Sequence, residues 1–250
     1  MQITGAITLV TGASSGIGAA TAEALSSAGA RLILTGRDED RLKAVAVKTN
    51  ATAFPADLSQ PGAPDELVRL ALATYGRIDL LVSNAGAGWA GPIGDLPGGT
   101  ADQLVAVNLL APVHLARLLI PGMAARGAGH LVFVSSIAGA TGVRHEAVYA
   151  ATKAGLNTLA ESLRYELADT GVGISVVLPG VVSTPFFSRR GRPYARHWPA
   201  PVSPDRVAGA IVTAVSHNRR VVYVPGWLHF PAWVHGIAPG TFRSLATMFS

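Results

Sequence analysis

The sequence predicts an α/β fold in which a doubly wound parallel sheet of about seven strands carries helices on both faces. Three observations support this fold class. Seven short apolar runs are nearly continuous, as strands covered on both faces require. Longer helical patterns separate these runs. A glycine-rich turn joins the first run to the first helical pattern, as in the strand–helix units of such sheets.

The expected elements alternate along the chain. We expect strands at residues 7–10, 31–35, 51–54, 80–83, 130–135, 173–178 and 221–224. We expect helices at residues 17–28, 38–48, 64–75, 101–126, 149–170 and 204–216. Two segments do not follow this alternation: a Pro- and Arg-rich loop at residues 181–203, and an apolar tail at 225–250 that prolines interrupt. Loops of that length often cover a binding site, so 181–203 is expected to be a substrate lid.

The composition excludes several classes of protein. Of the 250 residues, 49% are hydrophobic and 14% are charged, which excludes an intrinsically disordered chain. The absence of cysteine excludes a disulfide scaffold, thiolate metal sites and thiol catalysis. Neither a repeat nor a linker-like change in composition divides the chain, so we expect one domain over residues 1–250 and no metal site.

Location and partners are predicted from features that the sequence lacks. No stretch of about 18 apolar residues is free of charge, so no transmembrane segment is expected. The first residues lack the basic region and apolar run of a signal peptide, which favours a cytoplasmic protein. The net charge of +5 comes without a basic stripe interleaved with aromatic residues, so nucleic acid is not expected as a partner. The low charge content instead predicts a surface partly covered by a neighbouring subunit or an apolar ligand.

The glycine-rich turn is a candidate pyrophosphate site. It reads Thr-Gly-Ala-Ser-Ser-Gly-Ile-Gly and opens the first helix. Glycine lets the backbone approach an anion closely, and the helix N-terminus presents free N–H groups and a positive dipole end. Six residues of this turn are expected to hold a dinucleotide: Gly12, Ser14, Ser15, Gly16, Ile17 and Gly18.

This spacing, Thr-Gly-x-x-x-Gly-x-Gly, resembles the cofactor motif of the short-chain dehydrogenase/reductase family. The resemblance covers roughly residues 4–224, and it implies a Rossmann-type fold and a nicotinamide dinucleotide cofactor. Members are usually dimers or tetramers, so it also implies a homodimer or homotetramer. Further cofactor contacts are assigned by the resemblance to Asp57, Leu58, Asn84, Ala85, Gly86, Pro179, Gly180, Val182 and Thr184.

The end of the second strand bears on the choice of dinucleotide. NAD-selective sites place an acidic residue there to bind the ribose 2′-hydroxyl, but this chain has Gly36 followed by Arg37. The guanidinium of Arg37 is suited to a 2′-phosphate. Asp38 is a competing feature, because it either pairs with Arg37 or caps the next helix. The sequence therefore favours NADP(H) over NAD(H).

Tyr149 and Lys153 are the candidate catalytic pair, since their spacing of four places them on one face of a helix. A nearby ammonium favours the phenolate, so Lys153 is expected to lower the pKa of Tyr149 toward the working range. Ser136 lies thirteen residues before Tyr149, at the end of the fifth strand, where it is expected to hold the substrate oxygen. Its neighbour Ser135 is the alternative. The resemblance selects Ser136, and it also gives Tyr149 and Lys153 contacts with the cofactor.

Asn108 is the fourth candidate catalytic residue. Position 112 is proline, so it has no N–H for the carbonyl of Asn108, and a kink is expected in the helix there. A carbonyl left free in this way suits a water that links Lys153 to solvent, and the resemblance implies that proton-relay role. The alternative is a proline within an otherwise ordinary helix.

The substrate end is predicted to be apolar. The family resemblance places seven side chains at the substrate end: Trp89, Val143, His145, Phe186, Phe187, Tyr194 and Trp198. The expected activity is hydride transfer between nicotinamide and an apolar carbonyl or secondary-alcohol compound, with Tyr149 as general acid. Two alternatives remain: a 3-oxoacyl-thioester reductase, or a non-catalytic dinucleotide-binding regulator. The thioester alternative rests on a lid cluster that is either a solvated face or a carrier site: Arg189, Arg190, Arg192 and Arg196.

Overall fold

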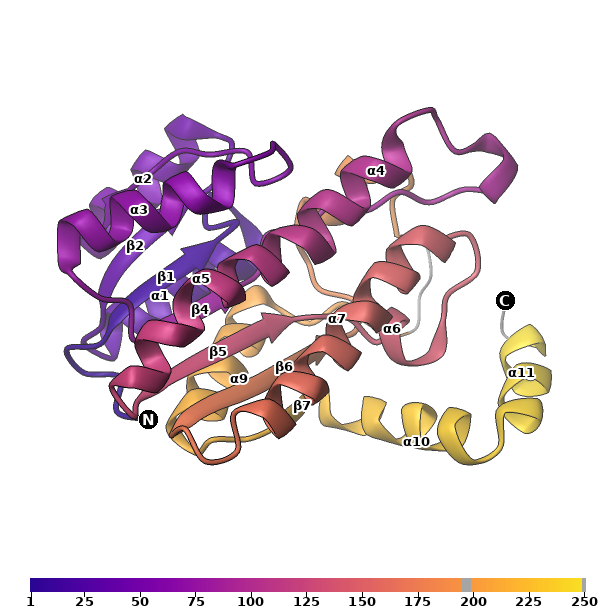
Figure 1. The fold of residues 1–250 in the computed structure, drawn as a ribbon. Coiled ribbons are helices and arrows are strands. Elements are labelled where there is room, and N and C mark those ends of the chain that lie inside the picture. Colours follow the sequence, from indigo (N-terminus) through magenta and orange to yellow (C-terminus); the bar gives the residue numbers. More distant parts are fainter. Residues whose placement is uncertain (195–198, 249–250) are drawn as a thin grey trace.

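The sheet has seven parallel strands in the order β3-β2-β1-β4-β5-β6-β7, which confirms the predicted doubly wound fold (Figure 1). The computed structural model describes residues 1–194 and 199–248. The strands are β1 (Ile7–Thr11), β2 (Arg31–Thr35), β3 (Thr52–Ala53), β4 (Leu80–Ser83), β5 (Gly129–Val134), β6 (Val172–Pro179) and β7 (Val221–Val224). The third strand is shorter than expected, because it pairs with only two residues at the sheet edge.

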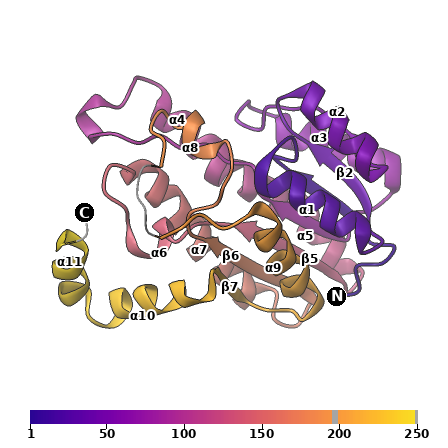
Figure 2. The same cartoon turned by 180° about the vertical axis from the view of Figure 1, so that it is seen from behind.

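Helices cover both faces of the sheet, as Figures 1 and 2 show from opposite sides. One face carries α1 (Gly16–Ser27), α2 (Glu39–Thr49) and α9 (Pro204–Ser216). The other carries α3 (Ala63–Tyr75), α5 (Ala111–Ala125) and α7 (Ala147–Glu166). Between these lie shorter elements: α4 (Thr100–Val105), α6 (Ala138–Thr141), α8 (Phe186–Arg189), and the short helical turns η1 (Ile93–Asp95) and η3 (Gly226–Leu228).

The uninterrupted apolar strands contribute side chains to two separate hydrophobic cores, one on each face of the sheet. Successive side chains of a strand point to opposite faces. In β5, Leu131 and Phe133 join the core under α3, α5 and α7, whereas Val132 and Val134 join the core under α1, α2 and α9. Because every position faces a covered side, no polar alternation appears in these strands.

The expected helix at 101–126 is divided in the structure. α4 passes into a π-helical turn, η2 (Ala106–Leu110), which passes into α5, and Pro112 lies in the first turn of α5. Pro112 has no N–H to donate to the carbonyl of Asn108, so one hydrogen bond of a regular α-helix is missing. The wider π-turn accommodates this interruption. The stretch Thr100–Ala125 is also the one described helix long and apolar enough to cross a membrane. Its buried residues Leu115, Leu119 and Met123 pack into the core of the sheet.

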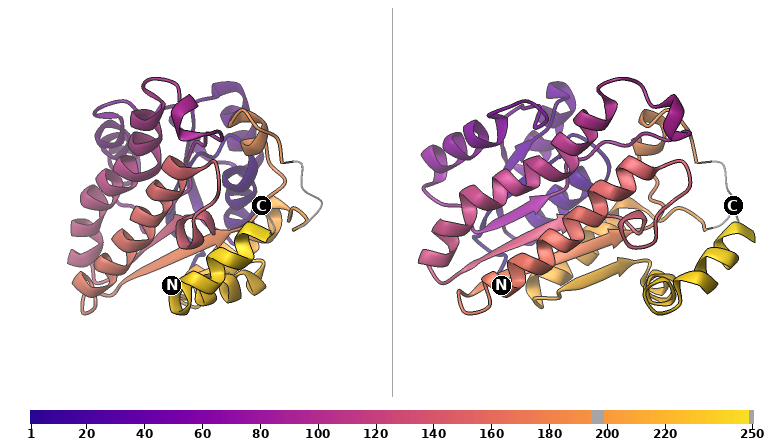
Figure 3. Two further views of the ribbon diagram at one scale, coloured as in Figure 1. Left: turned by 90° about the vertical axis from the view of Figure 1, so that its right-hand side faces the viewer. Right: turned by 45° about the vertical axis from the view of Figure 1, so that its right-hand side comes forward.

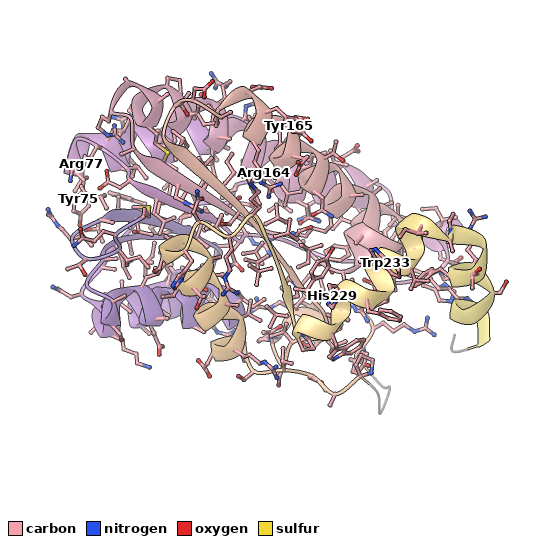
Figure 4. All side chains as sticks on the ribbon, turned by 90° about the horizontal axis from the view of Figure 1, so that it is seen from below. Tyr75, Arg77, Arg164, Tyr165, His229 and Trp233 are labelled. Atoms are coloured by element: carbon pink, nitrogen blue, oxygen red, sulfur yellow. The ribbon has the colours of Figure 1, made fainter. Side chains whose placement is uncertain are left out.

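The C-terminal tail forms two further helices that the sequence reading did not expect. These are α10 (His229–Ile237) and α11 (Pro239–Met248), which extend beyond the end of β7 (Figure 3). Prolines interrupt the apolar pattern, but they lie in the first turn of each helix, where their missing N–H costs nothing. Trp233 lies on this outer segment (Figure 4). It belongs to an exposed apolar set: Trp227, Phe230, Trp233 and Ile237.

A buried histidine lies at the opposite end of the sheet from the carboxyl ends of the strands. His130 of β5 is 1% exposed, and its Nε2 lies 2.8 Å from the Oγ of Ser175. That hydroxyl donates its one hydrogen to the carbonyl of Arg219 at 2.6 Å, so Nε2–H of His130 is the donor to Ser175. Burial lowers the pKa of His130 to about 4.

This histidine should make the protein sensitive to acid. The unfolded chain takes up a proton near pH 6.5, whereas the folded chain does so near pH 4. Above pH 6.5 His130 is neutral in both states, and its contribution to the free energy of unfolding is complete. As the pH falls toward 4 this contribution is lost, because the unfolded chain binds a proton before the folded chain does. Between pH 7 and pH 5 we expect His130 to account for a loss of about 2 kcal/mol in the free energy of unfolding.

Urea unfolding of wild type and His130→Gln at both pH values tests this expectation. The variant should lose about 2 kcal/mol less than wild type over this interval, whatever its stability at pH 7. His217→Gln changes an exposed histidine and serves as the control. Equal losses in wild type and His130→Gln would contradict the assignment.

Candidate functional site

A single cavity of about 1290 Å³ runs along the carboxyl ends of the strands. It crosses the point between β1 and β4 where the strand order reverses, which is where open α/β sheets bind ligands. All but two of the residues predicted from the sequence to be catalytic or to bind the cofactor line it. They are Gly12, Ser14, Ser15, Gly16, Ile17, Arg37, Asp57, Leu58, Asn84, Ala85, Gly86, Ser136, Tyr149, Lys153, Pro179, Gly180, Val182 and Thr184.

The glycine-rich turn is folded tightly over the start of α1. Gly18 does not line the cavity; it lies beneath the turn, where a Cβ would stand 2.2 Å from the carbonyl oxygen of Gly12. The amide of Asn84 donates to the carbonyls of Thr11 and Gly12 at 2.9 and 3.3 Å. Asn84 therefore ties the end of β4 to the turn, and the N-terminus of α1 is held open toward the cavity.

The end of β2 presents a cation. Asp38 accepts a hydrogen bond from the backbone N–H of Arg41 at 3.1 Å and pairs with its side chain, so it caps α2. Arg37 is exposed at the cavity and has no ion-pair partner among the described residues. A Cβ at Gly36 would lie 3.1 Å from the Oγ of Ser14, so an acidic side chain there would crowd this hydroxyl. Ser14 and Arg37 together leave an anion-binding corner.

The remaining cofactor-side residues are fixed by local contacts. The carboxylate of Asp57 accepts from the N–H and hydroxyl of Ser59 at 3.0 and 2.7 Å. Val182 is buried and pairs with Val202 in an isolated bridge that closes the base of loop 181–203. The methyl group of Thr184 packs on the glycine-rich turn, because a Cβ at Gly16 would lie 3.0 Å from it.

Tyr149 is buried, and it lines the same part of the cavity as Ser136. Burial raises the pKa of Tyr149 to about 12, and its interaction with the side chain of Ser136 only partly opposes this rise. The expectation that Lys153 lowers this pKa is therefore wrong for this structure. The Nζ of Lys153 lies 5.9 Å from the centre of the tyrosine ring, and desolvation outweighs its charge. The phenol is protonated at neutral pH, which suits a proton donor.

Lys153 is enclosed between β5 and the loop after β4. Its Nζ donates to the carbonyl of Val134 at 2.9 Å, and burial lowers its pKa to about 8. Its backbone carbonyl accepts from Ser135 at 3.2 Å, which occupies that hydroxyl. The alternative to Ser136 is thus engaged with helix α7. Ser136 is partly exposed and faces the cavity with Tyr149.

Asn108 is fully buried in the π-turn and does not line the cavity. Its side chain both accepts from the N–H and donates to the carbonyl of Ala87, at 2.9 Å each. It also donates to the hydroxyl of Thr152 at 3.1 Å. A Cβ at Gly86 would lie 3.1 Å from its Oδ1 and 3.6 Å from the Nζ of Lys153. The side chain is thus committed to structure, and only the backbone carbonyl is left for a relay.

Aromatic rings lead away from Tyr149 along loop 181–203. Phe186 lies 5.4 Å from Tyr149, Phe187 lies 5.6 Å from Phe186, and Tyr194 lies 5.5 Å from Phe187, measured between ring centres. These spacings are those of favourable aromatic pairs. Trp89 and His145 line an adjoining pocket of about 430 Å³. Trp198 lies outside the described residues.

Sequence reasoning missed a buried ion pair in this wall. Arg190 is 9% exposed, binds the carboxylate of Glu146 and stacks on Phe187 at 4.5 Å. The sequence reading treated the arginine cluster as either a solvated face or a carrier site, and for Arg190 neither description holds. No sequence signal links two residues 44 positions apart. Thr152 was also missed, although it stands beside Lys153 on α7 and holds Asn108.

Comparisons with known proteins agree with this geometry. The family model for short chain dehydrogenases matches residues 6–194. An uncharacterized oxidoreductase of Staphylococcus aureus strain MRSA252 is 35% identical over 73% of this chain and 80% of its own. A short-chain dehydrogenase from Sphingobium yanoikuyae in complex with NADPH has a TM-score of 0.84 and 29% identity, covering 97% and 95% of the two chains. One from Burkholderia phymatum in complex with NAD has a TM-score of 0.86 and 25% identity, covering 94% of each chain. The chain therefore belongs to the short-chain dehydrogenase/reductase family of oxidoreductases.

Proposed function

We propose that this oxidoreductase reduces the carbonyl group of an uncharged, apolar compound with NADPH. One observation carries the proposal: Ser136 and Tyr149 line the same cavity as the glycine-rich turn. A substrate oxygen at this pair and a dinucleotide on the turn would share one continuous space. Among the similar structures, one holds NADPH and another holds NAD. The preference for NADPH rests on Arg37 and Ser14.

The residues of this chain divide the reaction between them. The bound nicotinamide supplies the hydride that the carbonyl carbon receives. Ser136 holds the carbonyl oxygen, and the hydroxyl of Tyr149 gives its proton to that oxygen as the C=O electron pair moves onto it. Holding both partners in place supplies much of the acceleration. Lys153 lies on the next turn of the same helix. In this proposal it passes a proton to Tyr149 from a water held by the carbonyl of Asn108.

Two arginines of the loop are engaged in contacts within the protein. Arg190 is neutralised by Glu146 inside the wall of the cavity. Arg189 points to the glycine-rich turn, where its Nη1 lies 3.2 Å from the Oγ of Ser15. Arg196 lies outside the described residues. Because Arg190 and Glu146 neutralise each other in the aromatic wall, a charged substrate would find no opposite charge in that pair. This favours a neutral substrate.

The first test replaces the proposed proton donor. Tyr149→Phe removes one hydroxyl, and turnover of a ketone substrate should fall by roughly 10²- to 10⁴-fold, as expected for loss of a general acid. The dissociation constant for NADPH should stay close to that of wild type. Steady-state kinetics on a ketone panel and fluorescence titration measure the two quantities.

Tyr165→Phe makes the same chemical change on an exposed tyrosine of the same helix and serves as the control. If Tyr149→Phe keeps most of its kcat, the proposed mechanism is wrong. A non-catalytic regulator would show a different pattern, in which wild type binds the dinucleotide but reduces no ketone of the panel.

The second test concerns the choice of cofactor. Arg37→Ala should weaken NADPH binding by about 1.5–3 kcal/mol, because a charged hydrogen bond to the 2′-phosphate is lost. NADH lacks that phosphate, so its dissociation constant should hardly change. Titration of the nicotinamide fluorescence gives both constants.

Lys43→Ala removes an equal charge from α2 outside the cavity, and it controls for a general electrostatic effect. Equal losses for NADPH and NADH in Arg37→Ala would rule out a role in recognising the 2′-phosphate.

A further inference from the structure

Helix α8 is a single turn in loop 181–203 that contacts both ends of the cavity. Its first residue, Phe186, packs against the catalytic Tyr149. Its last residue, Arg189, donates from Nη1 to the Oγ of Ser15 at 3.2 Å, across 174 positions of sequence. The bridge between Val182 and Val202 closes the base of this loop. One turn therefore connects the reacting end of the cavity with the glycine-rich turn.

The position of Arg189 is electrostatically unfavourable in the protein taken by itself. Ser15 is the N-cap of α1, and the first turn of that helix has no acidic residue. The guanidinium thus lies at the positive end of a helix dipole, where a cation is repelled. Arg189 has no carboxylate partner within ion-pair distance among the described residues. An anion placed between them would satisfy both groups.

The neighbouring arginines show that this arrangement is specific to Arg189. Arg190, the next residue, is buried against Glu146. Arg37 lies at the end of β2, beside the corner formed by Ser14 and Gly36. Thr184 keeps the start of the loop in contact with Gly16. Among the described arginines of the loop, Arg189 alone contacts the N-terminus of α1, which is the expected place of the pyrophosphate.

We propose that Arg189 is a further cofactor-binding residue, which holds the pyrophosphate from the loop side while the glycine-rich turn holds it from below. The inference rests on the proposed function, since it takes the anion to be a dinucleotide. A guanidinium forms paired hydrogen bonds with phosphate oxygens. Both NADPH and NADH carry the pyrophosphate, so Arg189 contributes to the binding of both, unlike Arg37.

The test is fluorescence titration of wild type and Arg189→Ala with NADPH and with NADH at low salt. We expect both dissociation constants to rise by a similar factor, about 10- to 100-fold, as for loss of a charged hydrogen bond. Arg206→Ala removes an exposed arginine of α9 outside the cavity and should leave both constants unchanged. Unchanged binding in Arg189→Ala, or a loss for NADPH alone, would overturn the proposal.

Thermal unfolding separates this role from a purely structural one. Without any ligand, Arg189→Ala should melt at the same temperature as wild type or higher, because a repulsion at α1 is removed. A clearly lower melting temperature would mean that Arg189 only holds the loop in place, and would overturn the proposal.

Inorganic pyrophosphate is the probe that does not depend on the proposed function. It should raise the melting temperature of wild type more than that of Arg189→Ala. If wild type binds neither dinucleotide but shows this difference, the proposed function fails while the anion site at Arg189 stands. If pyrophosphate stabilises both proteins equally, the role of Arg189 is wrong.

Discussion

The side chain of Asn108 is the contact on which the geometry of the site depends. It closes a pair of hydrogen bonds with Ala87, in the loop after β4, and a third with Thr152 on α7. Thr152 in turn donates to the carbonyl of Tyr149 at 2.7 Å. One buried amide therefore fixes the distance between the loop after β4 and the helix that carries the proposed catalytic pair. Because the side chains of Asn108 and Thr152 are buried, losing one of them would leave polar atoms of the other unpaired.

The position of Asn108 also explains two local features that look unrelated in the sequence. Glycine fits at position 86 because a Cβ there would lie only 3.1 Å from the Oδ1 of Asn108. Pro112 withholds an N–H from the carbonyl of Asn108, and the π-turn η2 takes up the change in helical repeat. The proline gives the backbone carbonyl of Asn108 no N–H at position 112, while the side chain of Asn108 joins the loop after β4 to α7.

Most of the fold could be predicted from the sequence, because strands covered on both faces leave uninterrupted apolar runs and the turns between them are short. The residues lining the cavity were also largely predictable, since they follow strand ends at recognisable spacings. What could not be predicted depends on contacts between distant segments: Arg190 with Glu146, and Arg189 with Ser15. The protonation state of Tyr149 could not be predicted from the sequence either. Its spacing from Lys153 indicates a lowered pKa, but burial, which only the folded chain reveals, raises it.

The cavity is polarised along its length in a way that fits two different ligands. At the end formed by β2 and the glycine-rich turn, Arg37 and Arg189 line the space without carboxylate partners among the described residues, and the carboxylates of Asp38 and Asp57 lie at the same end. At the reacting end, Arg190 is matched by Glu146, and the burial of Tyr149 keeps its phenol neutral. An unpaired charge beside the substrate would be costly in this buried setting and would favour charged compounds. The same loop supplies an arginine without a carboxylate partner to one end and a paired arginine to the other, and this arrangement fits the proposed dinucleotide and the proposed neutral carbonyl substrate.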